Sequence, residues 1–265
     1  MRTTMLKEFD LGQKTKVELA DAHSHLDLIG DAGLIEDAVE YGVATIVTDG
    51  VDTKSNLKSL EMADGKHIFP ALGIGPEYAN SLQKGELEFN LKLIRENAKR
   101  VVAIGEIGLD YMIAEDAKNR TAQKRIFEAF LDLAEELKLP VCVHSRKAMD
   151  EVLSILEDRK SLAVQLHFFE GDVKDAKVAM DRGYMISIPP IESAKRKRVI
   201  NDVPVDRFLA ETDSPVVGST PKDVERVVRM IGGIKGIDYG RIAQTITANT
   251  KKFFNINKEK GFMRY

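Results

Sequence analysis

Two histidines stand two positions apart at the end of an apolar run near the start of the sequence. The stretch reads ELADAHSHLDL over residues 18–28 and contains His23 and His25. Residues two apart on a strand point to the same side, so we expect both imidazoles to face one space. Imidazole is a common ligand of divalent transition metals, so this pair could chelate one ion from one side.

Four more residues of the metal-binding kind end later apolar runs. They are Glu106, His144, His167 and Asp213. Four of the five histidines of the chain therefore end such runs, and His67 is the exception. A single strand histidine is more often a core residue, but six such placements together favour a metal site. Shared between two ions, four imidazoles and two carboxylates leave positions open for water, which suits hydrolysis of esters and phosphodiesters.

Eight short apolar or β-branched runs alternate with segments of helical spacing. The runs cover residues 17–23, 43–48, 68–74, 101–107, 140–145, 163–168, 184–188 and 207–212. Largely apolar strands that alternate with helices favour parallel pairing, and eight such units fit an α/β fold of the (β/α)8 TIM-barrel type. In such a barrel, chemistry occurs at the C-terminal ends of the strands, where we expect the six residues to converge.

Length and composition set further limits. The chain has 265 residues and a formal net charge of −3, which gives no global reason for tight, non-specific binding to nucleic acid. We expect a single hydrolase barrel over residues 1–265, in which 1–16 is an N-terminal extension and the barrel begins at about residue 17. Cys142 is the one cysteine, which favours a reducing compartment. The sequence shows neither a leader nor a membrane span, so we expect a cytoplasmic protein with no obligate protein partner.

Five ordered motifs resemble the TatD family of metal-dependent deoxyribonucleases, within the amidohydrolase superfamily. The motifs are DAHSHLD, GEIGLDY, LPVCVHSRKA, LHFFEG and ETDSP, and the resemblance extends from about residue 17 to NTKKFF at 249–254. It implies an enzyme that hydrolyses phosphodiester bonds of DNA with metal-activated water, often from the 3′ end, with single strands or 3′ ends as substrate. It also implies two divalent ions, for which zinc, manganese, magnesium and iron all suit the ligands.

The resemblance also implies a role for each residue. His23, His25, Glu106 and Asp213 would hold one ion, and Glu106, His144 and His167 would hold the second. Glu106 would then be the bridge between the two ions. Asp213 would be the general base that takes a proton from the attacking water.

Three departures from the family pattern fall on the parts that face the substrate. Gly75 stands in GIGP where the family usually has a histidine in G-x-H-P, the segment after ETDSP lacks the usual Arg and Asn-x-Pro run, and HFFEG replaces HCFTG. These departures leave an alternative, a metal-dependent ester hydrolase such as a D-aminoacyl-tRNA deacylase, or a hydrolase of another small phosphoester or amide. A second alternative is a non-catalytic binding protein that a metal stabilises.

Residues beside the six ligands have competing interpretations. Arg146 could bind a substrate phosphate through its forked donors or form a structural ion pair. The KRKR run at 195–198 is typical of a solvated helix surface, with contact to nucleic acid as the rarer alternative. We expect Asp21 and Glu211 to orient a histidine through a hydrogen bond, and Cys142 to pack as a small apolar group.

Overall fold

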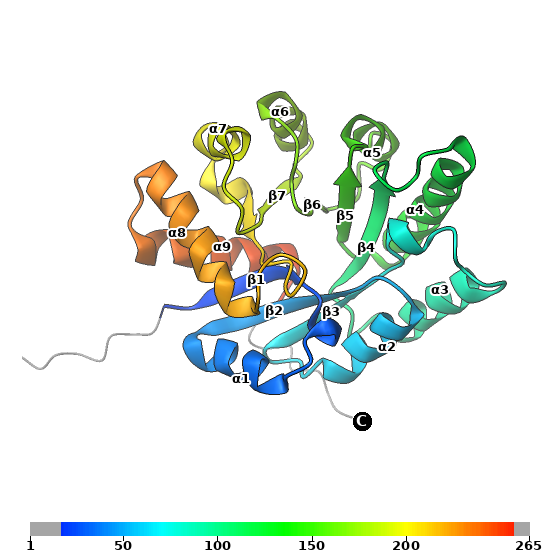
Figure 1. Cartoon of the computed structure of the whole chain (residues 1–265), viewed down its shortest axis with the longest axis horizontal. Helices are drawn as coiled ribbons and strands as arrows, with labels where there is room; N and C mark the ends of the chain where they lie inside the picture. The colour runs from blue at the N-terminus through cyan, green and yellow to red at the C-terminus, as the bar shows by residue number, and fades with distance from the viewer. Residues whose placement is uncertain (1–16, 257–265) are drawn as a thin grey trace, which may run out of the picture.

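The computed structural model describes residues 17–256, so the expected N-terminal extension over 1–16 lies outside the described residues. Within this range, eight parallel strands form one sheet in the order of the sequence, and helices surround them (Figure 1). The strands are β1 Leu19–Ser24, β2 Val43–Gly50, β3 Ile68–Leu72, β4 Ala103–Asp110, β5 Val141–Arg146, β6 Val164–Leu166, β7 Met185–Ile188 and β8 Phe208–Ala210. The predicted (β/α)8 barrel is therefore confirmed.

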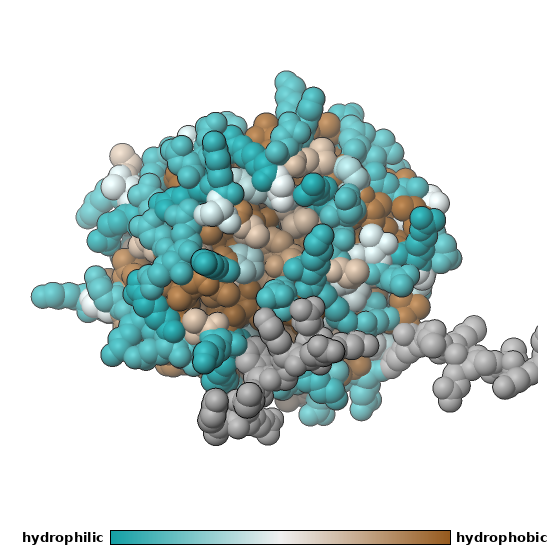
Figure 2. Space-filling view, turned by 180° about the vertical axis from the view of Figure 1, so that it is seen from behind, coloured by the Kyte–Doolittle hydropathy of each residue, from teal (hydrophilic) through white to brown (hydrophobic). Residues whose placement is uncertain are grey.

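Helices follow the strands and cover the outside of the barrel. They are α1 Ala32–Tyr41, α2 Thr53–Met62, α3 Glu86–Glu96, α4 Ala117–Leu137, α5 Met149–Leu156, α6 Val173–Asp181, α7 Ala194–Asp202, α8 Val224–Lys235 and α9 Tyr239–Phe253. Five of them begin at an aspartate whose carboxylate accepts first-turn N–H groups, at Asp31, Asp52, Asp116, Asp172 and Asp238. Such a cap stabilises a helix by about 1 kcal/mol. On the face shown in Figure 2, hydrophilic residues surround smaller apolar patches.

The barrel closes between β8 and β1 at the end where the ligand-type residues lie. The backbone N–H of Asp213 donates to the carbonyl of His23 at 3.0 Å, and that of His25 donates to the carbonyl of Ser214 at 2.7 Å. Helix α9 holds the opposite, N-terminal end of β1, since Thr247 Oγ1 donates to the carbonyl of Glu18 at 3.0 Å. Closure thus fixes the backbones on which three candidate ligands stand.

Two strand boundaries differ from the prediction in a way that matters for the site. The run at 101–107 suggested that Glu106 ends its strand, but β4 continues to Asp110 because Gly108 to Asp110 pair with β5. A side chain at Gly108 would approach the carbonyl oxygen of His144 to 2.1 Å, so glycine permits this pairing. Conversely, β6 ends before His167, because Phe168 takes a left-handed φ of 46° that a strand cannot contain.

Candidate metal centre

The barrel brings all six predicted ligand residues to one place. His23 lies in β1 and His25 directly after it, Glu106 lies in β4, His144 in β5, His167 directly after β6, and Asp213 in the loop after β8. All except His144 are less than a tenth exposed. The imidazole rings of His23 and His167 stack with their centres 3.6 Å apart, so residues from opposite parts of the sequence meet directly.

One group of four atoms has the spacing of a metal site. The Nε2 atoms of His23 and His25 are 3.2 Å apart, and each lies 3.5 Å from Glu106 Oε2. Asp213 Oδ1 lies 3.7 Å from the first nitrogen and 3.4 Å from the second. Ligand atoms about 2.0–2.1 Å from a tetrahedral metal are roughly 3.3–3.4 Å from one another. The residues present therefore fit a divalent ion.

The other oxygen of Glu106 faces a second group. Glu106 Oε1 lies 2.6 Å from His144 Nδ1 and 3.9 Å from His167 Nε2. Within residues 17–256, neither ring nitrogen of His144 makes a well-directed hydrogen bond, although both face carboxylates. Ligand atoms of these three residues all lie within 4.8 Å of one another. A carboxylate whose two oxygens face two ligand groups has the placement that a bridge between two ions requires.

Asp49 and Cys142 contact the imidazoles of His23 and His25, although the sequence analysis did not connect either residue to the site. Asp49, at the end of β2, places Oδ2 at 3.2 Å from His23 Nδ1, and its backbone carbonyl lies 2.9 Å from His25 Nδ1. The sulfur of Cys142 lies 3.1 Å from the same nitrogen of His23. Partners at Nδ1 direct both Nε2 atoms into the site. Cys142 is buried as predicted, but it contacts an imidazole rather than only apolar neighbours.

Of the two carboxylates expected to orient a histidine, one does so. Glu211 Oε2 lies 3.0 Å from His167 Nδ1, as predicted. Asp21 does not contact an imidazole: it accepts the backbone N–H of Thr212 at 2.8 Å and its hydroxyl at 2.6 Å. That expectation was wrong, because Asp21 points at the junction between β8 and β1, and it joins the two ends of the barrel.

Mutual attraction within the site sets the charge of its ionisable groups. Burial would raise the pKa of Glu106, but the imidazoles of His167 and His144 lower it well below the usual range. Burial would lower the pKa of His144, but Asp110 and Glu106 raise it to about 10. The proton that His144 retains thus balances carboxylate charge, and a bound metal cation would take over that role.

The position of the missing family histidine is occupied by a carboxylate. A side chain at Gly75 would start 2.5 Å from Glu77 Oε2, so the glycine leaves room for the Glu77 carboxylate to lie there. Burial of this carboxyl, followed by repulsion from Glu106, raises its pKa to about 7, although the residue as a whole is exposed. The sequence analysis missed Glu77 because it searched this loop for an imidazole.

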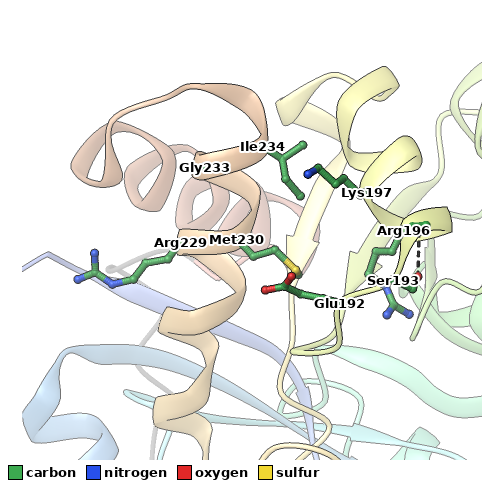
Figure 3. Close-up of a pocket in the computed structure, with 9 residues that line it drawn as sticks. Glu192, Ser193, Arg196, Lys197, Arg229, Met230, Gly233 and Ile234 are labelled. Carbon is green, nitrogen blue, oxygen red and sulfur yellow. Dashed lines mark hydrogen bonds between the residues drawn. The ribbon is translucent and has the colours of Figure 1, made fainter.

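A cavity of about 490 Å³ opens beside the metal-type ligands. His144, His167 and Asp213 form its inner wall, and Arg146 lies on its rim. The Arg146 side chain is half exposed, and its nearest carboxylate oxygen, on Asp110, is 3.9 Å away. A cavity of about 610 Å³ between α7 and α8 is larger but holds none of the six residues (Figure 3). Substrate therefore has room at the smaller cavity, next to the chemistry.

Comparison with known proteins agrees with this geometry. The family model "TatD related DNase" matches residues 20–255. The chain belongs to the TatD family. An uncharacterized metal-dependent hydrolase of Methanocaldococcus jannaschii is 31% identical over 249 residues, which cover 90% of this chain and 97% of that protein. A human protein named a deoxyribonuclease is 28% identical over 260 residues, with coverage of 90% and 95%.

Solved structures give the same fold. A TatD homologue from Escherichia coli superposes with a TM-score of 0.82 at 25% identity, covering 91% of this chain and 99% of the other. A TatD-family hydrolase from Entamoeba histolytica also gives a TM-score of 0.82, at 19% identity and the same coverage. This TatD protein is thus a metal-dependent hydrolase acting on ester bonds, so the alternative of a non-catalytic binding protein is not supported. Within residues 17–256, none of the helices has the length and apolar composition needed to cross a membrane.

Proposed function

We propose that this protein is a deoxyribonuclease that hydrolyses phosphodiester bonds with two divalent ions. The observation that carries the proposal is the placement of Glu106, which offers Oε2 to one ligand group and Oε1 to another. Two-ion sites of this kind stabilise the attacking and leaving oxygens of a displacement at phosphorus. The human relative named a deoxyribonuclease supports DNA as the substrate.

The six residues divide the work. His23, His25 and Asp213 would hold one ion with Glu106, and His144 and His167 would hold the other with Glu106. Bound divalent ions would supply Lewis acidity that polarises a phosphoryl oxygen and acidifies an attacking water. Asp213 has an oxygen in the first group and borders the cavity, so it would accept the proton of that water at Oδ.

The cavity supports a single-stranded end as the substrate. Its volume of about 490 Å³ suits a ligand of nucleotide size and is too small for a duplex. Arg146, at the rim, has no carboxylate of residues 17–256 closer than 3.9 Å and would donate to a phosphate oxygen there. We infer that the strand enters by one terminus, with the scissile phosphate next to Glu106.

The first experiment measures cleavage of 3′-labelled and 5′-labelled single-stranded oligonucleotides. Protein stripped of metal is reloaded with magnesium, manganese or zinc, beside a Glu106→Ala control. We expect cleavage only with metal, no product from the control, and a ladder that gives the polarity. Full activity after chelation, or two bound metals with intact DNA, would contradict the proposal.

Glu77 favours a second candidate, hydrolysis of an aminoacyl ester such as that of an aminoacyl-tRNA. An aminoacyl ester carries a cationic amino group next to its scissile carbonyl, and the carboxylate over Gly75 would attract that group. The same carboxylate repels a phosphodiester. Turnover of D-aminoacyl-tRNA and of the oligonucleotide by the same metal-loaded sample separates the two candidates.

A further inference from the structure

Arg196 is a buried cation that makes no direct ion pair with residues 17–256, and the carboxylates of Glu211 and Glu170 act on its charge only from a greater distance. This α7 residue is 8% exposed, and its Nε makes no hydrogen bond within the described part of the chain. One Nη donates to the backbone carbonyl of Ile191 at 2.6 Å, and no carboxylate of residues 17–256 forms an ion pair with the guanidinium. Burying an arginine in this way is costly without compensation, and the burial lowers its pKa. A ligand that supplies negative charge would remove this cost.

Arg196 borders the cavity that also holds the metal-type ligands. Figure 3 shows its side chain leaving α7 in a different direction from that of Lys197, which extends towards α8. Arg196 lines the same cavity as His167 and Asp213. A ligand in this cavity would therefore contact the metal-type ligands and the Arg196 guanidinium at the same time.

Phe168 is held in an unfavourable backbone conformation next to this arginine. Its φ of 46° is rare for a bulky residue. The Phe168 N–H donates to Glu211 Oε1 at 2.8 Å, and the other oxygen of Glu211 contacts His167. The ring centre lies 5.5 Å from the Arg196 guanidinium carbon and 5.9 Å from the ring of His167. Glu211 thus fixes the position of the Phe168 backbone relative to the His167 imidazole.

We propose that Arg196 and Phe168 form a subsite for a second phosphate of the substrate and its nucleobase, next to the bond that is hydrolysed. The guanidinium offers forked donors that match phosphate oxygens, and a phosphate accepts them while restoring charge balance. The Phe168 ring, with Ile191 and Val216 on the same cavity wall, supplies an apolar face for a base. This inference rests on the proposed nuclease function and adds that a phosphate beyond the scissile one increases the rate of hydrolysis.

The test compares substrates that differ only in that second phosphate. Thymidylyl-thymidine contains one internal phosphodiester, and two further versions carry an extra phosphate at the 5′ or the 3′ end. For the metal-loaded wild type, we expect kcat/KM to rise about 10- to 100-fold for one of the two, since a charge-assisted hydrogen bond contributes about 1.5–3 kcal/mol. Arg196→Met should remove this preference, so that the substrates with and without the extra phosphate are cleaved at similar rates.

Two further variants complete the design. Arg198→Met removes the same charge from an exposed position of the same helix and should keep the full preference. Arg196→Lys keeps the charge but loses the fork, and it should keep only part of the preference. The lysine variant also provides the test if the methionine variant does not fold.

Equal rates for all three substrates in the wild type, or a preference that survives in both Arg196 variants, would overturn the subsite. If the wild type cleaves none of them, the nuclease proposal fails and binding decides the subsite. Calorimetry would then compare thymidine 3′,5′-bisphosphate with thymidine 5′-monophosphate on manganese-loaded protein. A gain in affinity from the added phosphate that disappears in Arg196→Met supports the subsite, and the same gain in both proteins overturns it.

Discussion

The half of the barrel mouth built by β1–β4 differs from the half built by β5–β8 in what surrounds its ligand-type side chains. In the first half, His23 and His25 have buried partners behind them, and the Glu77 carboxylate lies over Gly75. In the second half, the ligand-type residues line an open cavity with Arg146 and Arg196 around it. The first half is built to hold ligands rigidly, and the second has the space and positive charge to receive an anionic substrate.

The largest effect should come from Asp213, which belongs to the first ligand group and also lines the substrate cavity. Asp213→Asn keeps the shape of the side chain but cannot accept a proton. We expect kcat on a single-stranded oligonucleotide to fall by about 10²- to 10⁴-fold, the range that loss of a general base produces. Metal content measured by atomic spectrometry shows whether the protein still binds two ions. A variant with wild-type kcat would remove Asp213 from the chemistry.

Glu211 should connect metal binding to substrate binding, because its two oxygens contact His167 and the Phe168 N–H. Glu211→Gln retains one of these contacts at most. We expect metal affinity to fall about 10- to 100-fold, as is usual for the loss of a partner behind a ligand. At saturating metal, KM should still be raised, because Phe168 is no longer held in place. Metal titration and steady-state kinetics on the same sample measure the two effects separately.

Asp49 provides the matched test in the first half, where its side chain contacts His23 and its carbonyl contacts His25. Asp49→Asn changes the side-chain partner of His23 and leaves the backbone in place. We expect a loss of metal affinity at the lower end of the same 10- to 100-fold range and an unchanged KM at saturating metal. An increase in KM as large as that of Glu211→Gln would contradict the division between the two halves.

The fold and the ligand-type residues were accessible from the sequence for a physical reason. Alternation of apolar strands and helices is a repeating signal in the sequence. In a barrel, residues at the C-terminal ends of the strands, such as His23 and His167, must lie close together, so their proximity can be predicted without knowing any contact. The partners of these residues were harder to predict. Asp49 and Glu77 lie at a strand end and in a loop, where the direction of a side chain depends on backbone turns. Arg196 lies within a basic run of a kind that is usually solvated. Burial of one member of that run is a tertiary property, which periodicity does not report.

The smallest expected effect concerns the charge of Glu77 on the first half of the mouth. Because its pKa is raised to about 7, this carboxyl is neutral below that pH and negative above it. Glu77→Gln should therefore increase kcat/KM for a phosphodiester by about 2- to 5-fold above pH 7, as expected for one weakly screened charge. The gain should disappear as the pH falls through 7, and turnover of an aminoacyl ester should change in the opposite direction.

The control is Glu88→Gln, which removes a carboxylate from an exposed position on α3. It should leave both pH profiles unchanged. If Glu77→Gln also changes neither substrate at any pH, the carboxylate does not reach the substrate, and the two halves of the mouth would differ in shape rather than in charge. Such a result would leave the arginines of the second half as the source of any selectivity for phosphate, which the substrates with an added phosphate measure directly.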